Sequence, residues 1–160
     1  MGFKLSGTES DYRELTIVDE TDRTITTYNK IETLFESGLR FESCIAQAAI
    51  LEAICYYYLI LAKTQNKLTF DKDSEKKIKT NDLTFGRTKN LLIDNKILLD
   101  DELADKLKGY VENRNLIAHR LISEMKIIDF DAFHKDGKEL IFYIWGLILK
   151  STEKFRAEHS

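Results

Sequence analysis

The sequence predicts an all-α fold, and three observations support that prediction. The chain has no proline and only seven glycines in 160 residues, so the residues that most often break helices are scarce. Hydrophobic residues make up 43% and charged residues 32%, which is typical of a globular protein. This length suits one domain over residues 1–160. We therefore expect four main helices, or five, around one hydrophobic centre.

The N-terminal segment, residues 1–24, is polar and has no clear pattern. It lacks the apolar core of a secretory signal peptide. Residues 24–28 have β-branched character typical of a strand, but residues 28–35 fit a helix equally well. A net charge of −3 gives no general attraction to nucleic acid, so any such binding needs a local basic surface.

Residues 39–63 predict a long helix, LRFESCIAQAAILEAICYYYLILAK, that is apolar around nearly its whole circumference and hence buried on most sides. Cys44 and Cys55 lie roughly 16 Å apart along it, too far for a disulfide, and are predicted to be buried thiols. The tyrosines at 56–58 are expected in the core, with base stacking as the alternative. The apolar runs 53–62 and 140–149 are each well short of the roughly 20 residues that span a bilayer, so no membrane is expected.

The second half of the chain predicts three further helices. Residues 64–83 are polar and predict a solvated loop or a helix end, with a basic rim for a polyanion as the functional alternative. A shorter helix is expected at 85–99, and acidic residues at 100–102 favour the start of a helix over 102–123. The last helix is expected over 131–158, interrupted near Gly137, with His134 close to that break.

One charged residue falls within the apolar face of the helix expected at 102–123. That face consists of Leu103, Leu107, Tyr110, Ile117 and Leu121. Arg114 lies in the middle of it, and a buried guanidinium has to be paired. Glu52 is the only charged residue between positions 42 and 63, so we expect an Arg114–Glu52 pair. Such a pair is either a structural salt bridge or part of a functional site.

His119 follows Arg114 by five residues, which is about 140° around an ideal helix, so the two do not share a face. Asn115 and His119, four residues apart, do share one. Two arrangements would bring Arg114 and His119 to one substrate. Either the helix is distorted between them, or two chains pair across a twofold axis and each contributes one of the two residues.

The stretch RNLIAH at residues 114–119 resembles the Arg-x4–6-His signature of HEPN domains, which often carry a polar residue after the arginine. The helix order resembles that family too, with the motif on the helix that precedes the C-terminal one. The resemblance covers roughly residues 25–158. It implies a four- to five-helix bundle that forms a homodimer through the motif helices. No fused nuclease, ATPase or nucleotidyltransferase segment accompanies it, so a partner domain would be a separate chain.

Many HEPN proteins are metal-independent endoribonucleases that act as toxins of toxin–antitoxin pairs or in antiviral defence. The resemblance therefore implies a cytoplasmic endoribonuclease (a hydrolase) that needs neither metal nor cofactor. A separate antitoxin or nucleotidyltransferase would be its partner. The 2′-hydroxyl of the RNA attacks the neighbouring phosphate, and histidine moves the protons while arginine holds the phosphate. The implied catalytic residues are Arg114, His119, Asn115 and Glu52. The RNA-binding candidates are Arg120, Lys108, Arg87, Lys89 and Lys126. Each of them can also be interpreted as a plain surface residue.

Two other interpretations remain open. One is a non-catalytic HEPN-like helical dimer that binds RNA, a nucleotide or a protein. The other is a helical interaction protein in which Arg114 and Glu52 are purely structural. The sequence does not indicate which RNA is cut or which regulator silences the activity.

Overall fold

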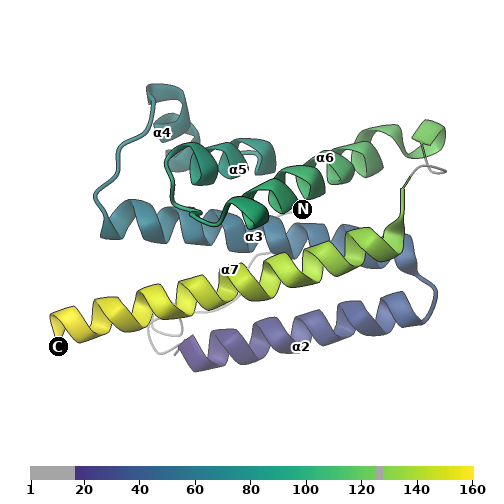
Figure 1. Ribbon diagram of the computed structural model, residues 1–160, viewed down its shortest axis with the longest axis horizontal. Coiled ribbons are helices and arrows are strands. Elements are labelled where there is room, and N and C mark those ends of the chain that lie inside the picture. Colours follow the sequence, from purple (N-terminus) through teal and green to yellow (C-terminus); the bar gives the residue numbers. More distant parts are fainter. Residues whose placement is uncertain (1–16, 125–127) are drawn as a thin grey trace.

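A computed structural model describes residues 17–124 and 128–160, and describes side chains for residues 25–118 and 128–160. The all-α prediction is confirmed, because these residues form six helices and no strand (Figure 1). The helices are α2 (Ile17–Glu36), α3 (Arg40–Gln65), α4 (Lys72–Lys79), α5 (Phe85–Asp94), α6 (Asp101–Glu124) and α7 (Phe130–His159). The ambiguous residues 24–28 thus belong to a helix.

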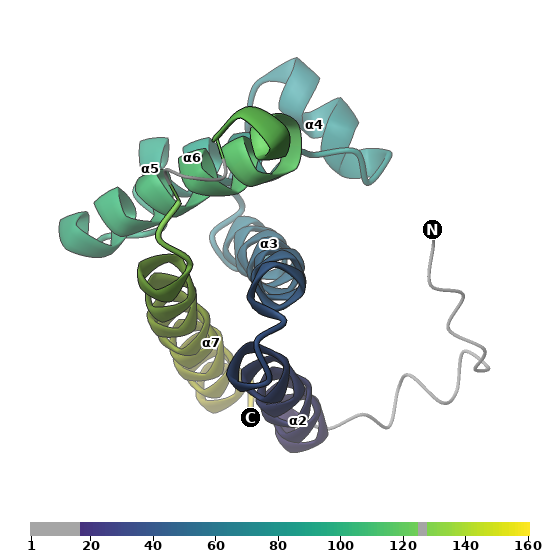
Figure 2. The ribbon, with the colours of Figure 1, turned by 90° about the vertical axis from the view of Figure 1, so that its right-hand side faces the viewer.

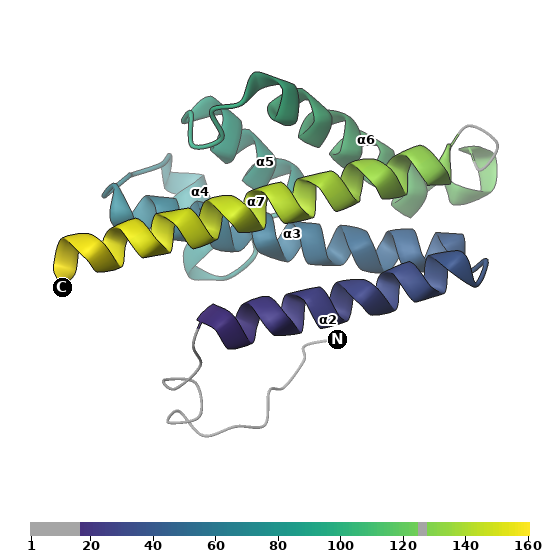
Figure 3. The same ribbon diagram turned by 60° about the horizontal axis from the view of Figure 1, so that its bottom comes forward.

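The central element of the bundle is α3. Viewed towards one end, α3 lies between α2 and α7 on one side and α5 and α6 on the other (Figure 2). Figure 3 shows α2, α3 and α7 running alongside one another over much of their length. The motif helix α6 packs against α7 and α5. The same central helix therefore supports both the N-terminal hairpin and the motif-bearing half of the fold.

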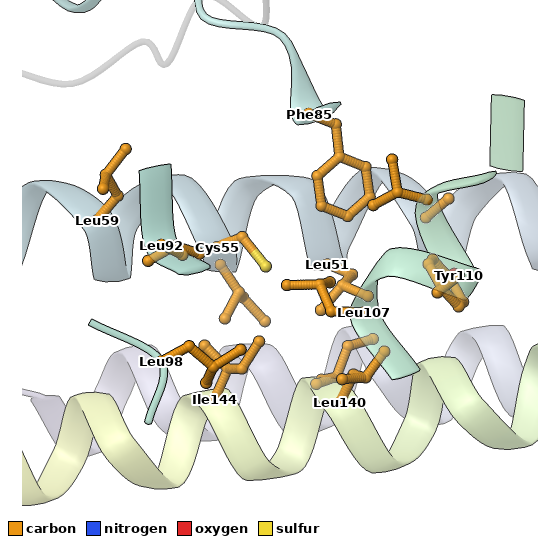
Figure 4. Packing of buried hydrophobic residues seen from close by; sticks show 14 of the residues in the cluster. Leu51, Cys55, Leu59, Phe85, Leu92, Leu98, Leu107, Tyr110, Leu140 and Ile144 are labelled. Atoms are coloured by element: carbon orange, nitrogen blue, oxygen red, sulfur yellow. The ribbon is translucent and has the colours of Figure 1, made fainter. Parts of the chain in front are cut away.

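The buried core consists of aliphatic and aromatic side chains, most of them from α3, α5, α6 and α7, together with Tyr28 from α2. Figure 4 shows part of this core. Leu51, Leu59, Leu107 and Leu140 have no exposed surface. Truncating a leucine in such a position costs about 2–5 kcal/mol, since the cavity is only partly refilled. The core is thus built where helices of both halves meet α3.

Both cysteines are free and fully buried on α3, as predicted. Burial raises the pKa of the Cys44 thiol to about 12, and it raises the pKa of Cys55 as well. Because the thiolate is the reactive form, both groups are inert in the folded state.

The interpretation of residues 64–83 as a loop or a helix end was incomplete, because α4 forms within this stretch. The carboxylate of Asp71 accepts a hydrogen bond from the Ser74 amide at 3.0 Å and caps the helix. Glu75 in turn accepts one from the Phe70 amide at 2.8 Å. Hydrogen bonds from Ser74 lower the pKa of Asp71 to about 2. Two caps therefore stabilise a helix of only eight residues.

The predicted interruption of the last helix at Gly137 was wrong. α7 is continuous over 30 residues, beginning after Asp129, whose carboxylate accepts from the Ala132 amide at 3.0 Å. A Cβ atom at Gly137 would overlap the Gln47 side chain and lie 2.7 Å from Cε2 of Tyr110. The glycine is therefore needed for close packing of α7 against α3 and α6, and not for a turn.

The apolar part of α3 is longer than the run at 53–62 indicated. By length and composition alone, the 26 residues of α3 would suffice to cross a membrane. The core helix of a globular protein meets the same criterion, so this is weak evidence. In the structure, α3 packs against α2, α5 and α7, and nine of its residues are buried.

Candidate functional site

The predicted contact between Arg114 and Glu52 is present. Nη2 of Arg114, on α6, donates to Oε2 of Glu52, on α3, at 3.3 Å. The side chains are 30% and 33% exposed, so the interpretation of both as buried charges was wrong. An ion pair with this exposure contributes about 1 kcal/mol or less to stability, because water screens it. Both charges remain within reach of a ligand.

Asn115 extends this contact by one residue. Its Oδ1 accepts a hydrogen bond from Nη1 of Arg114 at 3.3 Å, and the residue is exposed. A guanidinium has five N–H donors, and these two contacts use one each from Nη1 and Nη2. We call Glu52, Arg114 and Asn115 the Arg114 cluster. The remaining N–H donors of the Arg114 guanidinium can bind an anion.

His119 and Arg120 lie within α6, but their side chains are outside the described part of the structure, and Lys126 lies outside the described residues. α6 is one α-helix from Asp101 to Glu124. The helix is therefore not interrupted between Arg114 and His119, and their directions from the axis differ by about 140°. Nothing in the helix assignment supports the distorted-helix arrangement.

The other basic candidates have local contacts. Nη2 of Arg87 lies 2.8 Å from Oδ2 of Asp71, and its Nε donates to Oγ of Ser74 at 3.0 Å, which ties α5 to the first turn of α4. Lys108 pairs with Asp105 of its own helix at 3.1 Å, and Lys89 is half-buried. These contacts explain local stability, and an RNA-binding role of the three residues stays a prediction.

A pocket of about 550 Å³ opens beside Glu52 and was not predicted. It is lined by residues 81 and 83 and by six residues of α3, which are Ala49, Glu52, Ala53, Tyr56, Tyr57 and Ile60. The expectation that tyrosines 56–58 are core was wrong for Tyr57, which is 44% exposed, while Tyr56 and Tyr58 are half-buried. The spacing of Ala49 and Ala53, one turn apart and exposed, was the available signal for an open face on α3.

A second polar group lies inside the bundle, and sequence reasoning missed it. Gln47 on α3 has no exposed surface, and its Nε2 donates to the carbonyl oxygen of His134 at 2.8 Å. Its Oε1 accepts from the hydroxyl of Tyr110 at 3.0 Å. Tyr28 donates to Oε1 of Glu32 at 2.6 Å, and the same oxygen lies 2.9 Å from Nε2 of His134. These five residues, here called the Gln47 cluster, link α2, α3, α6 and α7.

Burial and hydrogen bonding shift the pKa values of the Gln47 cluster. Burial raises the pKa of both Tyr28 and Tyr110 well above the ordinary value. Burial by itself would raise the pKa of Glu32, but the hydrogen bonds from Tyr28 and His134 outweigh it, and the pKa is lowered. Among the described side chains, no buried nitrogen or oxygen lacks a hydrogen-bond partner. The buried side-chain nitrogen and oxygen atoms of the cluster therefore all have hydrogen-bond partners.

The described residues contain no group of three or more His, Cys, Asp or Glu side chains able to hold a metal ion. The side chain of His119 is outside the described residues, so the prediction of a metal-free site stays a prediction.

Comparisons with protein-family models, curated proteins and solved structures found no match to this chain.

Proposed function

We propose that this protein is a metal-independent endoribonuclease of the HEPN type, acting as a toxin or an antiviral defence effector in the cytoplasm. The observation that supports the proposal most is the Arg114 cluster. An arginine of the RNLIAH motif is held by a carboxylate from an earlier helix, with Asn115 beside it. The Arg114 side chain is 30% exposed, so its guanidinium can bind a phosphate without unfolding any part of α6.

The proposed reaction is an internal phosphoryl transfer. The 2′-oxygen of the RNA forms a bond to the adjacent phosphorus, and the bond from phosphorus to the 5′-oxygen breaks. One histidine takes the proton of the 2′-hydroxyl, and another gives a proton to the departing 5′-oxygen. Arg114 stabilises the charge that develops on the phosphate, Glu52 holds Arg114 in place, and Asn115 binds the phosphate or positions His119. The products are a 2′,3′-cyclic phosphate and a 5′-hydroxyl.

The continuous helix α6 favours a site shared by two chains. Because residues five apart on an ideal helix differ by about 140° in direction, the proposed site combines Arg114 of one protomer with His119 of its partner. A twofold dimer places two histidines at one cleft, which provides a base and an acid. A separate antitoxin or nucleotidyltransferase chain is the proposed regulator.

RNA cleavage tests the proposal. The purified chain is incubated with single-stranded RNA in the presence of EDTA, and the products are analysed for cyclic phosphate ends. We expect His119→Ala to lower the rate by about 100-fold to 10,000-fold, as for loss of a general acid–base group, with a similar loss for Arg114→Ala. His159→Ala is the matched control, because His159 ends α7 and stacks on Phe155. Equal cleavage by wild type and His119→Ala would disprove the catalytic role.

Mixing wild type with His119→Ala tests whether the site is shared. If one cleft needs the histidines of both protomers, a mixed dimer is inactive and only dimers of two wild-type chains cut RNA. Equal amounts of the two chains, exchanged at random, then give about a quarter of the wild-type rate, since about a quarter of the dimers contain two wild-type chains. A rate of about one half would mean that each chain cuts RNA with its own histidine.

The pocket beside Glu52 favours a second candidate function. In that case the chain is a non-catalytic HEPN-like dimer that binds RNA or a nucleotide. Binding would weaken as salt rises, and no RNA would be cut in the assay above.

A further inference from the structure

The pocket beside the Arg114 cluster is lined by small and by larger side chains, most of them from α3. Ala49 and Ala53 lie one helical turn apart on α3, and both are exposed. Tyr56, Tyr57 and Ile60 continue the same side of the helix. A volume of about 550 Å³ is within the usual range for sites that bind small ligands.

The polar groups of the pocket come from two elements. Glu52 engages Arg114 through Oε2, and its Oε1 has no hydrogen-bond partner among the described residues. Asn81 lines the pocket from the segment after α4, where its φ of 53° lies in the left-handed region that asparagine tolerates. A backbone hydrogen bond from Asn81 N to the carbonyl oxygen of Ile78, at 3.1 Å, fixes this turn. The pocket therefore offers a carboxylate acceptor and an amide that both donates and accepts.

We propose that this pocket, here called the base pocket, binds a nucleobase of the RNA substrate and prefers a base with adjacent N–H donors, guanine above all. The inference deepens the proposed function and rests on it for the phosphate at Arg114. Glu52 belongs both to the base pocket and to the ion pair with Arg114, so a ligand in the pocket lies next to a phosphate-binding cation. A nucleotide likewise carries a flat base and a phosphate, one for each of these two adjacent groups.

The charge of the base pocket also indicates which end of a nucleotide enters. The Glu52 carboxylate repels a phosphate, whereas it accepts hydrogen bonds from the imino and amino groups of guanine. The tyrosine rings provide the surfaces on which bases stack in single-stranded nucleic acid. The expected arrangement is therefore the base against α3 and the adjacent phosphate at Arg114.

Binding of RNA that cannot be cut tests the base pocket apart from catalysis. The probes are end-labelled 2′-O-methyl octanucleotides, which lack the attacking hydroxyl: one of eight uridines, and three with a single central guanosine, adenosine or cytidine. Fluorescence anisotropy gives the dissociation constants for the full chain. For wild type we expect about tenfold tighter binding of the guanosine probe than of the all-uridine probe, the order of magnitude given by one hydrogen bond to a charged group. Equal affinity for all four probes would overturn the proposal.

Two variants alter the base pocket and one does not. Ala53→Trp fills the space and should abolish the preference for guanosine. Asn81→Gly removes the amide while suiting the left-handed backbone, and should reduce the preference at least threefold, an order-of-magnitude expectation for one lost hydrogen bond. Ala132→Trp is the control, because Ala132 is exposed near the start of α7, and it should behave as wild type. Circular dichroism verifies that each variant is folded.

The outcomes separate this inference from the proposed function. If wild type prefers the guanosine probe and Ala53→Trp does not, but neither cuts the corresponding ribonucleotide, the base pocket stands and the nuclease proposal fails. If wild type cuts RNA but Ala53→Trp and Asn81→Gly bind every probe like wild type, the nuclease proposal stands and the base pocket fails.

Discussion

The Gln47 cluster and the Arg114 cluster both link helices through polar groups, yet they differ in solvent exposure and in the number of helices that they join. Gln47 is fully buried, and its cluster ties four helices together without leaving a buried side-chain polar atom unpaired among the described residues. Arg114 and Glu52 are each about one third exposed and join only α6 to α3. A buried network is strong when complete and costly when broken, whereas an exposed pair is weak in either case.

This difference indicates separate purposes. The Gln47 cluster specifies how α2, α3, α6 and α7 meet, because its five residues come from all four helices and are hydrogen-bonded to one another. The Arg114 cluster adds little to stability and keeps charged atoms accessible next to a pocket. Mutations in the first should therefore destabilise the protein, and mutations in the second should leave its stability nearly unchanged but alter function.

The largest expected effect is that of Gly137→Ala. The added methyl group collides with Gln47 and Tyr110, so it both overpacks the core and breaks the Gln47 cluster. We expect a loss of about 4 kcal/mol in the free energy of unfolding, measured by urea denaturation. Gly146→Ala is the matched control in the same helix, since no atom lies within 4 Å of its added Cβ, and it should gain about 0.5–1 kcal/mol from helix propensity. Equal stability of the two variants would contradict the close packing of α7.

Gln47→Leu should follow with a loss of about 3 kcal/mol. The leucine fills similar space but leaves the Tyr110 hydroxyl without its acceptor and the His134 carbonyl without its donor, both buried. Urea denaturation measures the change. Gln65→Leu serves as the control at the half-buried end of α3 and should lose less than about 1 kcal/mol. A neutral Gln47→Leu would mean that the cluster is dispensable.

Acid should destabilise the protein through Glu32. Its pKa is lower in the folded state than the ordinary 4.5, so its stabilising contribution is complete above about pH 4.5 and is lost as the pH falls through the folded-state value. Glu32→Gln should therefore be less stable than wild type at pH 7, by about 1 kcal/mol, and should lose less on acidification. Unfolding free energies from pH 3.5 to 7 measure the difference. Glu36→Gln, exposed one turn further along α2, should follow the wild-type curve.

The smallest effect on stability should be that of Arg114→Ala, below about 1 kcal/mol, because both partners of its ion pair are partly exposed. The same variant is expected to lose RNA cleavage. If it instead loses several kcal/mol and His119→Ala has no effect on cleavage, the Arg114 cluster is a structural bridge like the Gln47 cluster. Thermal and urea denaturation, run beside the cleavage assay, distinguish these cases.

Much of the fold could be predicted because its long helices carry strong patterns. An isolated carboxylate on α3 and an arginine in the apolar face of α6 indicated their contact before any coordinates. The degree of exposure could not be derived, since a periodic pattern gives the direction of a side chain but not how far the neighbouring helices extend over it. The same limit applies to Tyr57, which was assigned to the core because its helix is apolar all round.

Other errors arose from residues whose local and tertiary preferences disagree. Gly137 predicted a break by local propensity, but packing against Gln47 requires a glycine inside a continuous helix. Gln47 was not predicted because it carries no charge, although an uncharged amide in such a helix equally requires partners. α4 was missed because caps at Asp71 and Glu75, and not apolar periodicity, stabilise it.

The two buried thiols make the opening of the bundle chemically measurable. Cys44 lies three residues from Gln47, and Cys55 lies three residues from Glu52, so each reports on the surroundings of one polar cluster. A thiol-specific reagent reacts only when a thiol is transiently uncovered, and its rate gives the free energy of that opening. If the region around Glu52 fluctuates more readily than the Gln47 cluster, Cys55 will react first, and a ligand in the base pocket will slow it while leaving Cys44 unchanged.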